Sequence, residues 1–409
     1  MKPSAGRVVV PLKDVAHVYS GGTPARANPA YWGGSVPWVT TAEIDQRHIR
    51  SSREAITELG LSASAARIAP PGTLLLAMYG QGKTRGKVAI LELAASMNQA
   101  CAAIEVGSRV DANYLFHYLD SRYADIRAMS NSGSQDNLSG ELVRSIPVAI
   151  PPIGEQRTIA GVLNDADELI RSLERLVVKK RAIKQGLMQQ LLTGRTRLAG
   201  FTDEWGVRTI ASLIDGLVAG TSVRSVDGRA RPAVLKTSAV RDGKFDAGEV
   251  KSILQQDVHR ASCTPVADSL IISRMNTPAM VGDVGYVEHA QPGLYLPDRL
   301  WLARSRSGTG TSMRWLASLL SHGATAQAVR DLATGTSNSM KNIPKSRFLA
   351  LRVSTPTSEE QHAIAEVLRN ADDEISALEG RLESARAVKI GMMQELLTGR
   401  TRLPVEVVS

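Results

Sequence analysis

The chain contains one long segment that occurs twice. Residues 155–198, EQRTIAGVLNDADELIRSLERLVVKKRAIKQGLMQQLLTGRTRL, return as residues 360–403 at a constant offset of 205 residues, from Glu155 to Glu360, without a gap. Of the 44 aligned positions, 25 are identical, which is far beyond coincidence. The protein is therefore a tandem duplication, and its two halves are expected to build the same kind of unit.

Both copies have the periodicity of a long helix. Their apolar residues recur at alternating steps of four and three, which is typical of the seam of a coiled coil. Each copy follows a proline, Pro152 or Pro356, and ends at a Thr-Gly pair, where glycine suits the left-handed C-terminal turn. About 38 residues at 1.5 Å per residue give two helices of roughly 57 Å each.

Neither helix can bury its apolar stripe alone, so we expect the two helices to pack on each other. The residues predicted to form this interface are Ile159, Leu163, Ile170, Leu173, Leu187, Leu191, Ile364, Leu368, Ile375, Leu378, Met392 and Leu396. Lys184 and Lys389 occupy the same seam position in the two copies. Two interpretations of these lysines stay open: a long side chain that extends from an imperfect seam to solvent, or a polar device that fixes register or orientation.

Two segments with short strand-like runs and turns lie before and between the helices. They resemble each other faintly, and the apolar runs at 74–76 and 270–272 correspond. We predict an α+β protein in which two globular α/β segments alternate with two long helices. The predicted order is a first globular segment (1–152), a central helix (153–198), a second globular segment (199–355), a C-terminal helix (356–403) and a tail (404–409).

Composition and charge narrow the class of protein only a little. The formal net charge of +9 makes a polyanion such as nucleic acid a plausible partner. The two isolated cysteines, Cys101 and Cys263, argue against a disulfide framework and fit a reducing compartment. Because the chain has neither a signal-like start nor an apolar run of about 18 residues, we expect a cytoplasmic protein with no membrane partner.

The stretch AMYGQGKTRG, residues 77–86, fits the relaxed pattern of a phosphate-binding loop. Such a loop should open a helix whose N-terminus holds the phosphates, but a β-like run, VAIL, follows it instead. The duplicated segment has RMNTP, residues 274–278, in the same slot. We therefore predict a loop that joins two strands and no nucleotide hydrolysis.

Other catalytic patterns are equally weak. The sequence NPAY at 28–31 departs from the base-gripping motif of amino-methyltransferases, and too little chain precedes it for a cofactor-binding half. Glu249 and Lys251 lack the separate metal-binding carboxylate of a nuclease, and the seven histidines have no metal-ligand spacing. We predict no catalytic residue, no metal site and no cofactor bound by this chain.

Basic and amide residues remain in glycine-rich loops at matching places in both globular segments. Arginine and lysine pair with phosphates or guanine edges, and asparagine and glutamine suit adenine. Each residue alone also fits an ordinary solvated charge or turn former, so only the set points to DNA. The predicted DNA-binding residues are Arg26, Lys83, Arg85, Lys87, Gln135, Asn137, Arg224, Arg274, Asn276, Asn338 and Lys341.

Several segments together resemble a specificity subunit of a type I restriction-modification system (the HsdS family). The resemblance is carried by PPIGEQRTIAGVLNDADELI and LLTGRTRL in the first half, and by EEQHAIAEVLRNADDEI and LLTGRTRL in the second. The first globular segment adds SGGTPARANPAYWGGSVPWVTTAEI, GKTRGKVAI and NQACAAI. The resemblance covers nearly the whole chain, and the second globular segment matches less closely than the first.

The resemblance implies a division of labour. Each globular segment would be a target-recognition domain that reads one half of an asymmetric bipartite site in double-stranded DNA. The helices, at 155–192 and 360–397, would pack antiparallel as a coiled coil with pseudo-twofold symmetry and dock two modification subunits, which bring S-adenosylmethionine. Restriction subunits would supply ATP- and magnesium-dependent translocation and cleavage, so this chain would be the non-catalytic DNA-binding subunit of a DNA methylation complex.

Two alternatives stay open. One is a two-headed DNA-binding protein of another defence or regulatory system, and the other is a coiled-coil scaffold whose globular segments bind proteins. DNA recognition predicts salt-sensitive binding and half-sites centred roughly 34–36 Å or somewhat more apart. The scaffold alternative predicts no salt-dependent DNA binding.

Overall fold

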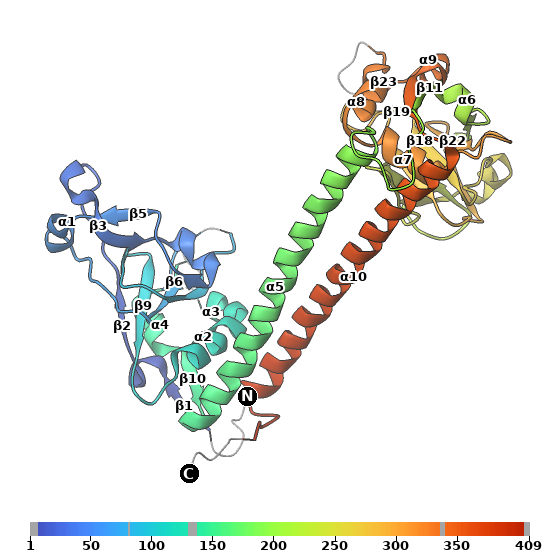
Figure 1. Cartoon of the computed structure of the whole chain (residues 1–409). Coiled ribbons are helices and arrows are strands. Elements are labelled where there is room, and N and C mark those ends of the chain that lie inside the picture. The colour runs from blue at the N-terminus through green and yellow to red at the C-terminus, as the bar shows by residue number, and fades with distance from the viewer. Residues whose placement is uncertain (1–6, 81, 130–136, 336–339, 405–409) are drawn as a thin grey trace. The chain divides into compact units, whose positions relative to one another are not determined.

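The computed structural model describes residues 7–80, 82–129, 137–335 and 340–404. The chain forms two compact units, residues 1–174 with 380–409 and residues 175–379. Each unit holds one globular segment together with a part of each long helix (Figure 1). The boundary between the units therefore crosses both helices, whereas the segment boundaries predicted above follow the repeat.

In the part of the chain that the structure describes, the first unit contains two sheets and a separate strand pair. Its five-stranded sheet has the order β2-β9-β6-β7-β4 and is antiparallel except for the parallel pair β4–β7, and its three-stranded sheet has the order β5-β3-β8. Strand β1 pairs antiparallel with β10. The elements are β1 (Val8–Pro11), β2 (Ala16–Ser20), β3 (Trp32–Val39), β4 (His48–Ile49), β5 (Glu54–Ile56), α1 (Glu58–Ser62), β6 (Leu74–Ala77), β7 (Val88–Leu91), β8 (Ser96–Met97), β9 (Cys101–Val106), α2 (Ala112–Ser121), α3 (Tyr123–Ala128), α4 (Gly140–Ser145) and β10 (Pro147–Ile150).

Strands β6 and β7 of this unit are apolar along their whole length because both faces of the sheet are covered. Leu74 and Leu76 of β6 belong to the larger core, which also contains α2, whereas Leu75 and Ala77 point into a second core. Successive strand residues point to opposite faces, so a sheet buried on both faces needs a continuous apolar run. The run at 74–76 is therefore a central strand.

The second unit repeats this plan. Strand β18 lies between β20 and β22, as β6 lies between β7 and β9, and the sheets have the orders β12-β22-β18-β20 and β13-β17-β14-β21. Leu270 and Ile272 of β18 point into one core and Ile271 into another. The elements are β11 (Gly206–Thr209), α6 (Ile210–Leu213), β12 (Val218–Ala219), β13 (Ser225–Val226), β14 (Ala233–Leu235), β15 (Val240–Arg241), β16 (Lys244–Phe245), β17 (Val250–Ile253), β18 (Ser269–Ser273), β19 (Met275–Asn276), β20 (Val284–Val287), β21 (Leu294–Tyr295), β22 (Leu300–Arg304), α7 (Met313–Leu320), α8 (Gly323–Asp331), β23 (Lys341–Asn342), α9 (Lys345–Ala350) and β24 (Arg352–Thr355).

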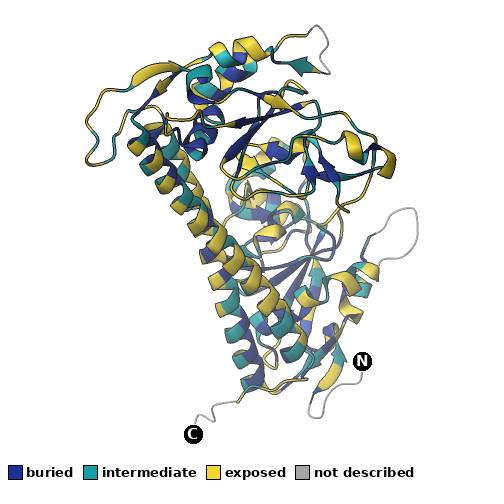
Figure 2. Ribbon diagram, turned by 90° about the vertical axis from the view of Figure 1, so that its right-hand side faces the viewer, coloured by how far each residue is buried: buried dark blue, intermediate teal, exposed yellow. Residues whose placement is uncertain are grey.

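The two repeated segments form the long helices α5 (Ile153–Leu191) and α10 (Ser358–Leu396), so the expected helices are confirmed. Each helix ends in a turn whose glycine has a positive φ, 69° at Gly194 and 75° at Gly399, as the Thr-Gly pairs predict. Figure 2 shows exposed positions running along both helices, whereas the strands are mostly buried. Among the described residues no helix is long and apolar enough to cross a membrane.

The helices run antiparallel within each unit. In the first unit Glu174 pairs with Arg386 at 2.5 Å and Asp167 pairs with Lys389 at 2.6 Å. From one ion pair to the next, the residue number on α5 rises while the residue number on α10 falls, as expected for antiparallel helices. In the second unit Arg181 pairs with Glu379 and Lys184 pairs with Asp372, which is the same antiparallel order, and Lys180 also pairs with Glu374.

The predicted seam residues are largely shielded from solvent. All of them are buried except Leu187 and Met392, which are partly buried. In the first unit Ile159 and Leu163 share a core with Leu396. In the second unit Ile364 and Leu368 share a core with Leu191 and also with α7 and α9. Seam residues therefore pack the two helices against each other and also attach each globular segment to the helices.

The lysines in the seam pair with aspartates of the opposite helix. Lys184 donates to Asp372, and Lys389 donates to Asp167, with N–O distances of 2.6 Å in both cases. The offset of 205 residues relates both the lysines and the aspartates, so one ion pair occurs twice. Lys389 is buried. The interpretation of this lysine as a side chain that extends to solvent is therefore wrong.

The second residue of the repeat, a glutamine, makes equivalent hydrogen bonds in both copies. Gln156 accepts from the backbone N–H of Asp111, before α2, and donates to the carbonyl of Pro151. Gln361 does the same for Ser312, before α7, and for Pro356. The amide of each glutamine thus joins the start of a long helix to the start of a globular helix, which explains why this residue is identical in the two copies.

Candidate nucleic-acid interface

The loop at 78–87 joins the antiparallel strands β6 and β7, as predicted. A strand begins at Val88, and no helix opens there to hold a phosphate. Gly86 has a φ of 85° and donates its N–H to the carbonyl of Ala77 at 2.8 Å, which closes the base of the loop. The phosphate-binding pattern is thus a connection between two strands and not the start of a helix.

The basic residues of this loop differ in accessibility. Lys83 is exposed near the tip, whereas Arg85 is buried. Lys87 is partly buried and forms an ion pair with Asp45. In the free protein only Lys83 is fully presented to a ligand, so Arg85 is a weaker candidate for direct contact with DNA.

Arg26 lies in the SGGTPAR segment beside two aromatic rings. Its guanidinium lies 3.8 Å from the ring centroid of Trp32 and 4.7 Å from that of Trp38, and it pairs with Glu54. Cation–π contacts and an ion pair both limit the rotamers of an arginine. Arg26 is therefore a half-exposed cation held in one place, which suits a role in recognition.

Two further candidates, Gln135 and Asn137, lie between α3 and α4 in the sequence. Asn137 is partly buried and precedes Leu138, whose N–H donates to the carbonyl of Met78 at 2.9 Å. That hydrogen bond places Asn137 beside the start of the 78–87 loop. Gln135 lies outside the described residues, as does Asn338 of the second unit.

In the second unit Arg224 is exposed and pairs with the buried carboxylate of Asp257 at 3.1 Å. The side-chain hydrogen bond from Arg224 holds the pKa of Asp257 below its ordinary value. Arg274 is partly buried, with its guanidinium 5.8 Å from the ring centroid of Trp301. Lys341 is partly buried and donates to the carbonyl of Gly335. Arg274 and Lys341 lie at the β18–β20 connection, where Lys341 pairs with Asn276 across β23 and β19, whereas the contacts of Arg224 are with the segment at 254–257.

Asn276 has a structural role in the same connection. It is buried, its amide donates to the hydroxyl of Ser273 at 3.1 Å, and its carbonyl oxygen accepts from the N–H of Thr277 at 2.9 Å. Like Arg85, it is not presented on the surface of the free protein. Direct contact between Asn276 and DNA is therefore less favoured than contact through Arg224 or Arg274.

The two globular segments carry opposite charges at one equivalent position. Lys87 and Asp283 each precede the strand that follows the loop, β7 or β20. Lys87 pairs with Asp45, whereas Asp283 faces Arg241 as well as Asp242. Burial, followed by Asp242, raises the pKa of Asp283 to about 6. Comparison of the two halves of the sequence aligns Lys87 with Asp283. The charged partners of both residues lie some 40 residues away in the sequence, and no sequence pattern identifies them.

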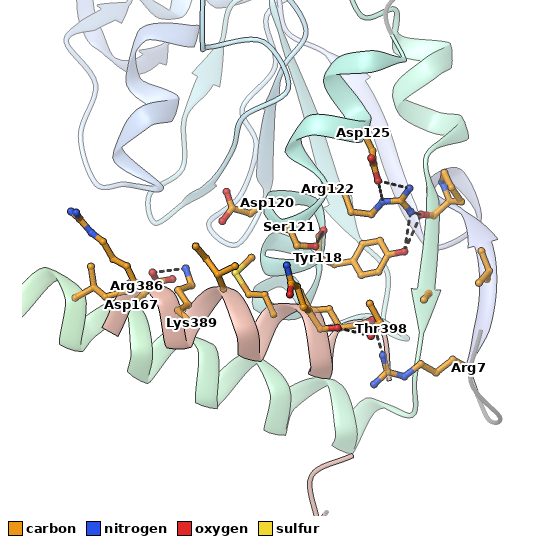
Figure 3. A pocket seen from close by; sticks show the side chains of 18 residues that line it. Arg7, Tyr118, Asp120, Ser121, Arg122, Asp125, Asp167, Arg386, Lys389 and Thr398 are labelled. Atoms are coloured by element: carbon orange, nitrogen blue, oxygen red, sulfur yellow. Dashed lines mark hydrogen bonds and ion pairs between the residues drawn. The ribbon is translucent and has the colours of Figure 1, made fainter. Parts of the chain in front are cut away.

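A pocket of about 940 Å³ lies in the first unit, between α2, β10 and the last turns of α10 (Figure 3). Most of its wall is apolar, with Ile170, Ile390 and Met393 among the lining residues, and charged side chains lie among them. Arg7 lies at one end, where it donates to Glu155 and to the carbonyls of Leu396 and Leu397. It thereby satisfies carbonyls that the end of a helix leaves unpaired.

An ion network forms the wall of this pocket beside the helices. Asp167 accepts from Lys389 at 2.6 Å and from Arg47 at 3.2 Å, and Arg47 also donates to Asp120 at 3.0 Å. Burial acts to raise the pKa of Asp167, but Arg47 and Lys389 together hold it below its ordinary value. The buried imidazole of His117 lies 3.9 Å from the same carboxylate, and burial lowers its pKa to about 4.

The second unit keeps only part of this network. Gly243, with a φ of 81°, stands where Arg47 stands in the first unit with a φ of 63°. A Cβ on Gly243 would lie 3.4 Å from Ser321 at the end of α7, as Arg47 lies beside Asp120 of α2. The Lys184–Asp372 pair remains. Among the described residues, no group of three or more His, Cys, Asp or Glu side chains can hold a metal ion.

Comparison with known proteins agrees with this architecture. The family described as type I restriction modification DNA specificity domain matches residues 6–179. The specificity subunit of the Escherichia coli type I restriction enzyme EcoR124I/EcoR124II is 25% identical over 180 residues, which are 42% of this chain and 44% of that protein. The match spans less than half of that relative's length.

Two other similarities extend over nearly the whole chain. The putative type I restriction enzyme MjaX specificity subunit of Methanocaldococcus jannaschii is 23% identical over 427 residues, covering 96% of this chain and 93% of that protein. The crystal structure of the type I restriction-modification S subunit from M. genitalium superposes with a TM-score of 0.61 at 10% identity, covering 97% of this chain and 99% of that one. Residues 6–179 thus match the type I restriction modification DNA specificity domain, and the chain is similar to type I restriction enzyme specificity subunits over nearly its whole length.

Proposed function

We propose that the chain is the DNA-recognition subunit of a type I restriction-modification complex and reads an asymmetric bipartite target. The first globular segment would read one half-site and the second globular segment the other. The observation that carries the proposal is that the helices and strands are duplicated, whereas the loops between the strands differ in sequence. Equivalent strands border the two loops, β6 and β7 for 78–87 and β18 and β20 for 274–283. The residue before the second strand is nevertheless Lys87 in the first loop and Asp283 in the second.

Docking of two modification subunits on the helix pair is part of the proposal. Ile183 of α5 and Val388 of α10 are 46% and 59% exposed, and they occupy the same position in the two copies of the repeat. A single exposed apolar side chain is common on a protein surface, so what supports docking is its recurrence at the same position in both copies. A duplicated apolar position supports two equivalent docking sites, one in each unit.

The catalytic steps would belong to the partner subunits. S-adenosylmethionine would bind to the modification subunits, and ATP and magnesium would bind to the restriction subunits. This chain would supply sequence recognition through Arg26, Lys83, Lys87, Arg224 and Arg274, the cations described above. Phosphate contacts by such cations make binding fall steeply with added salt.

The proposal is tested by purifying the chain together with its modification subunit and mapping the methylated bases in genomic DNA. The expected result is adenine methylation within one asymmetric bipartite sequence. A complex that forms but methylates without sequence preference would show that the globular segments are misassigned. A chain whose binding to DNA does not depend on salt would support the protein-interaction scaffold instead.

A further inference from the structure

The recognition loop at 78–87 needs support from outside itself. Gly80, Gly82 and Gly86 have φ values of 137°, 79° and 85°, in the region that glycine adopts most easily. A loop with so many glycines has many accessible conformations, so the backbone alone does not hold Lys83 in one place. Discrimination between bases requires side chains that are held within a fraction of an ångström.

Helix α3 supplies this support at the tip of the loop. The hydroxyl of Tyr123 donates to the backbone carbonyl of Lys83 at 2.8 Å, and the guanidinium of Arg127 donates to the same hydroxyl at 3.1 Å. A hydroxyl that accepts from a cation becomes a better donor, so the two hydrogen bonds strengthen each other. The peptide of Lys83 is therefore held by a chain of two side chains from α3.

The same helix supports the base of the loop. A Cβ built on Gly86 would lie 3.6 Å from the backbone of Arg127 and from the carbonyl of Tyr123, so the loop backbone packs directly on α3. The helix is itself anchored, because Ile126 is buried in the core that contains Met78 and Val88. Tyr123 and Arg127 thus project from an element that is fixed to both ends of the loop.

We propose that Tyr123 and Arg127 are positioning residues for base recognition in the first half-site. They act through the peptide of Lys83 and need not touch DNA. This inference rests on the proposed function, since it takes the 78–87 loop as a part of the DNA interface.

The second unit supports its equivalent loop by other means. A Cβ on Gly282 would lie 2.7 Å from Val329 of α8, so the base packs on a helix there as well. The first half of that loop is held by the strand pair β19–β23 and by the Asn276–Ser273 hydrogen bond. A change at Tyr123 therefore alters the support of one loop only, and its effect should be confined to one half-site.

The test uses the complex of the full chain with its modification subunit. Methylation rates are measured on the mapped target and on targets with single base changes in each half-site. Tyr123→Phe removes the hydroxyl and keeps the ring. We expect discrimination between correct and altered bases to fall about threefold to tenfold in one half-site and to stay unchanged in the other. This decrease corresponds to the loss of one or two hydrogen bonds.

Tyr114→Phe is the matched control. Its hydroxyl also donates to a backbone carbonyl, that of Ala149 at 2.7 Å, but in the core and away from the loop. We expect this variant to lose stability while it keeps the discrimination of both half-sites. Equal loss of discrimination in both tyrosine variants would show that Tyr123 only stabilises the fold and would overturn the inference.

A double-mutant cycle with Lys83→Ala separates positioning from a general structural role. If Tyr123 acts through Lys83, then Tyr123→Phe should have no further effect on the first half-site once Lys83→Ala is present. Additive effects of the two substitutions would contradict the inference. A wild-type complex without any bipartite preference would overturn the proposed function, whereas unchanged discrimination in Tyr123→Phe overturns this inference alone.

Discussion

Asp167 and Asp372 occupy the same position in the repeat but differ in their surroundings. The Asp167 and Lys389 side chains are 14% and 8% exposed, compared with 38% and 20% for Asp372 and Lys184. Asp167 also accepts from Arg47, whose backbone has a positive φ that is uncommon for any residue other than glycine. One carboxylate thus balances two cations in the first unit.

We predict that Asp167→Asn destabilises the protein more than Asp372→Asn does. Removing the first carboxylate leaves the buried ammonium of Lys389 without its counter-charge, which costs about 2–4 kcal/mol by analogy with broken buried pairs. The more exposed pair should lose at most about 1 kcal/mol. Urea unfolding followed by circular dichroism measures both losses, and equal losses would show that burial does not distinguish the two pairs.

His117 should make the stability of the first unit depend on pH. Its pKa is about 4 in the folded protein, compared with about 6.5 when unfolded. Between these values the unfolded state binds the proton and the folded state does not, so stability should fall by roughly 2–3 kcal/mol as the pH drops from 6.5 to 4. Asp167, with its pKa held low, loses its contribution only at still lower pH.

The pH dependence is measured as the urea midpoint at pH 7 and at pH 5. His117→Gln should show a smaller decrease between these two values than the wild type does. His289, which is exposed, provides the control, and His289→Gln should keep the decrease of the wild type. A decrease that persists unchanged in His117→Gln would assign the pH dependence to other groups.

At the scale of elements, the long helices separate two kinds of apolar position. Seam residues such as Leu163 are buried and hold the helix pair and the globular segment together. Ile183 and Val388 face outward at equivalent positions and are the proposed docking positions for modification subunits.

We predict that Ile183→Ser and Val388→Ser leave stability almost unchanged but weaken docking. Each substitution should remove one of the two modification subunits, and the double variant should remove both. Size-exclusion chromatography with mass determination counts the bound subunits. Leu163→Ala is the contrasting variant, because loss of a buried leucine should cost about 2–5 kcal/mol. Retention of both modification subunits by the double variant would place the docking surface elsewhere.

At the scale of the whole molecule, the duplication itself is open to test. Replacing residues 199–355 with a second copy of residues 1–152 should give a complex that methylates a target with two like half-sites. The expectation follows because the repeat carries the same glutamine contacts and the same seam ion pair in both copies. Methylation mapping reads the outcome, and an unchanged asymmetric target would contradict modular recognition.

Much of the fold could be predicted from the sequence because it is encoded locally. Steps of four and three between apolar residues specify a helix seam, and continuous apolar runs such as 74–76 specify strands buried on both faces. The candidate site was less predictable. Glycine-rich composition indicated the proposed recognition loops, but Arg85 and Asn276 proved to be buried, and burial depends on neighbours that are distant in sequence.

By itself the sequence determined the duplication, the two long helices and the strand connection at 78–87. Only the tertiary structure decided which residues meet across the chain. The last turns of α10 join the first unit because the helices run antiparallel, and Lys389 therefore meets Asp167, 222 positions away. No periodic pattern in the sequence predicts this ion pair or the hydrogen bond from Tyr123 to Lys83, because both depend on how separate elements pack.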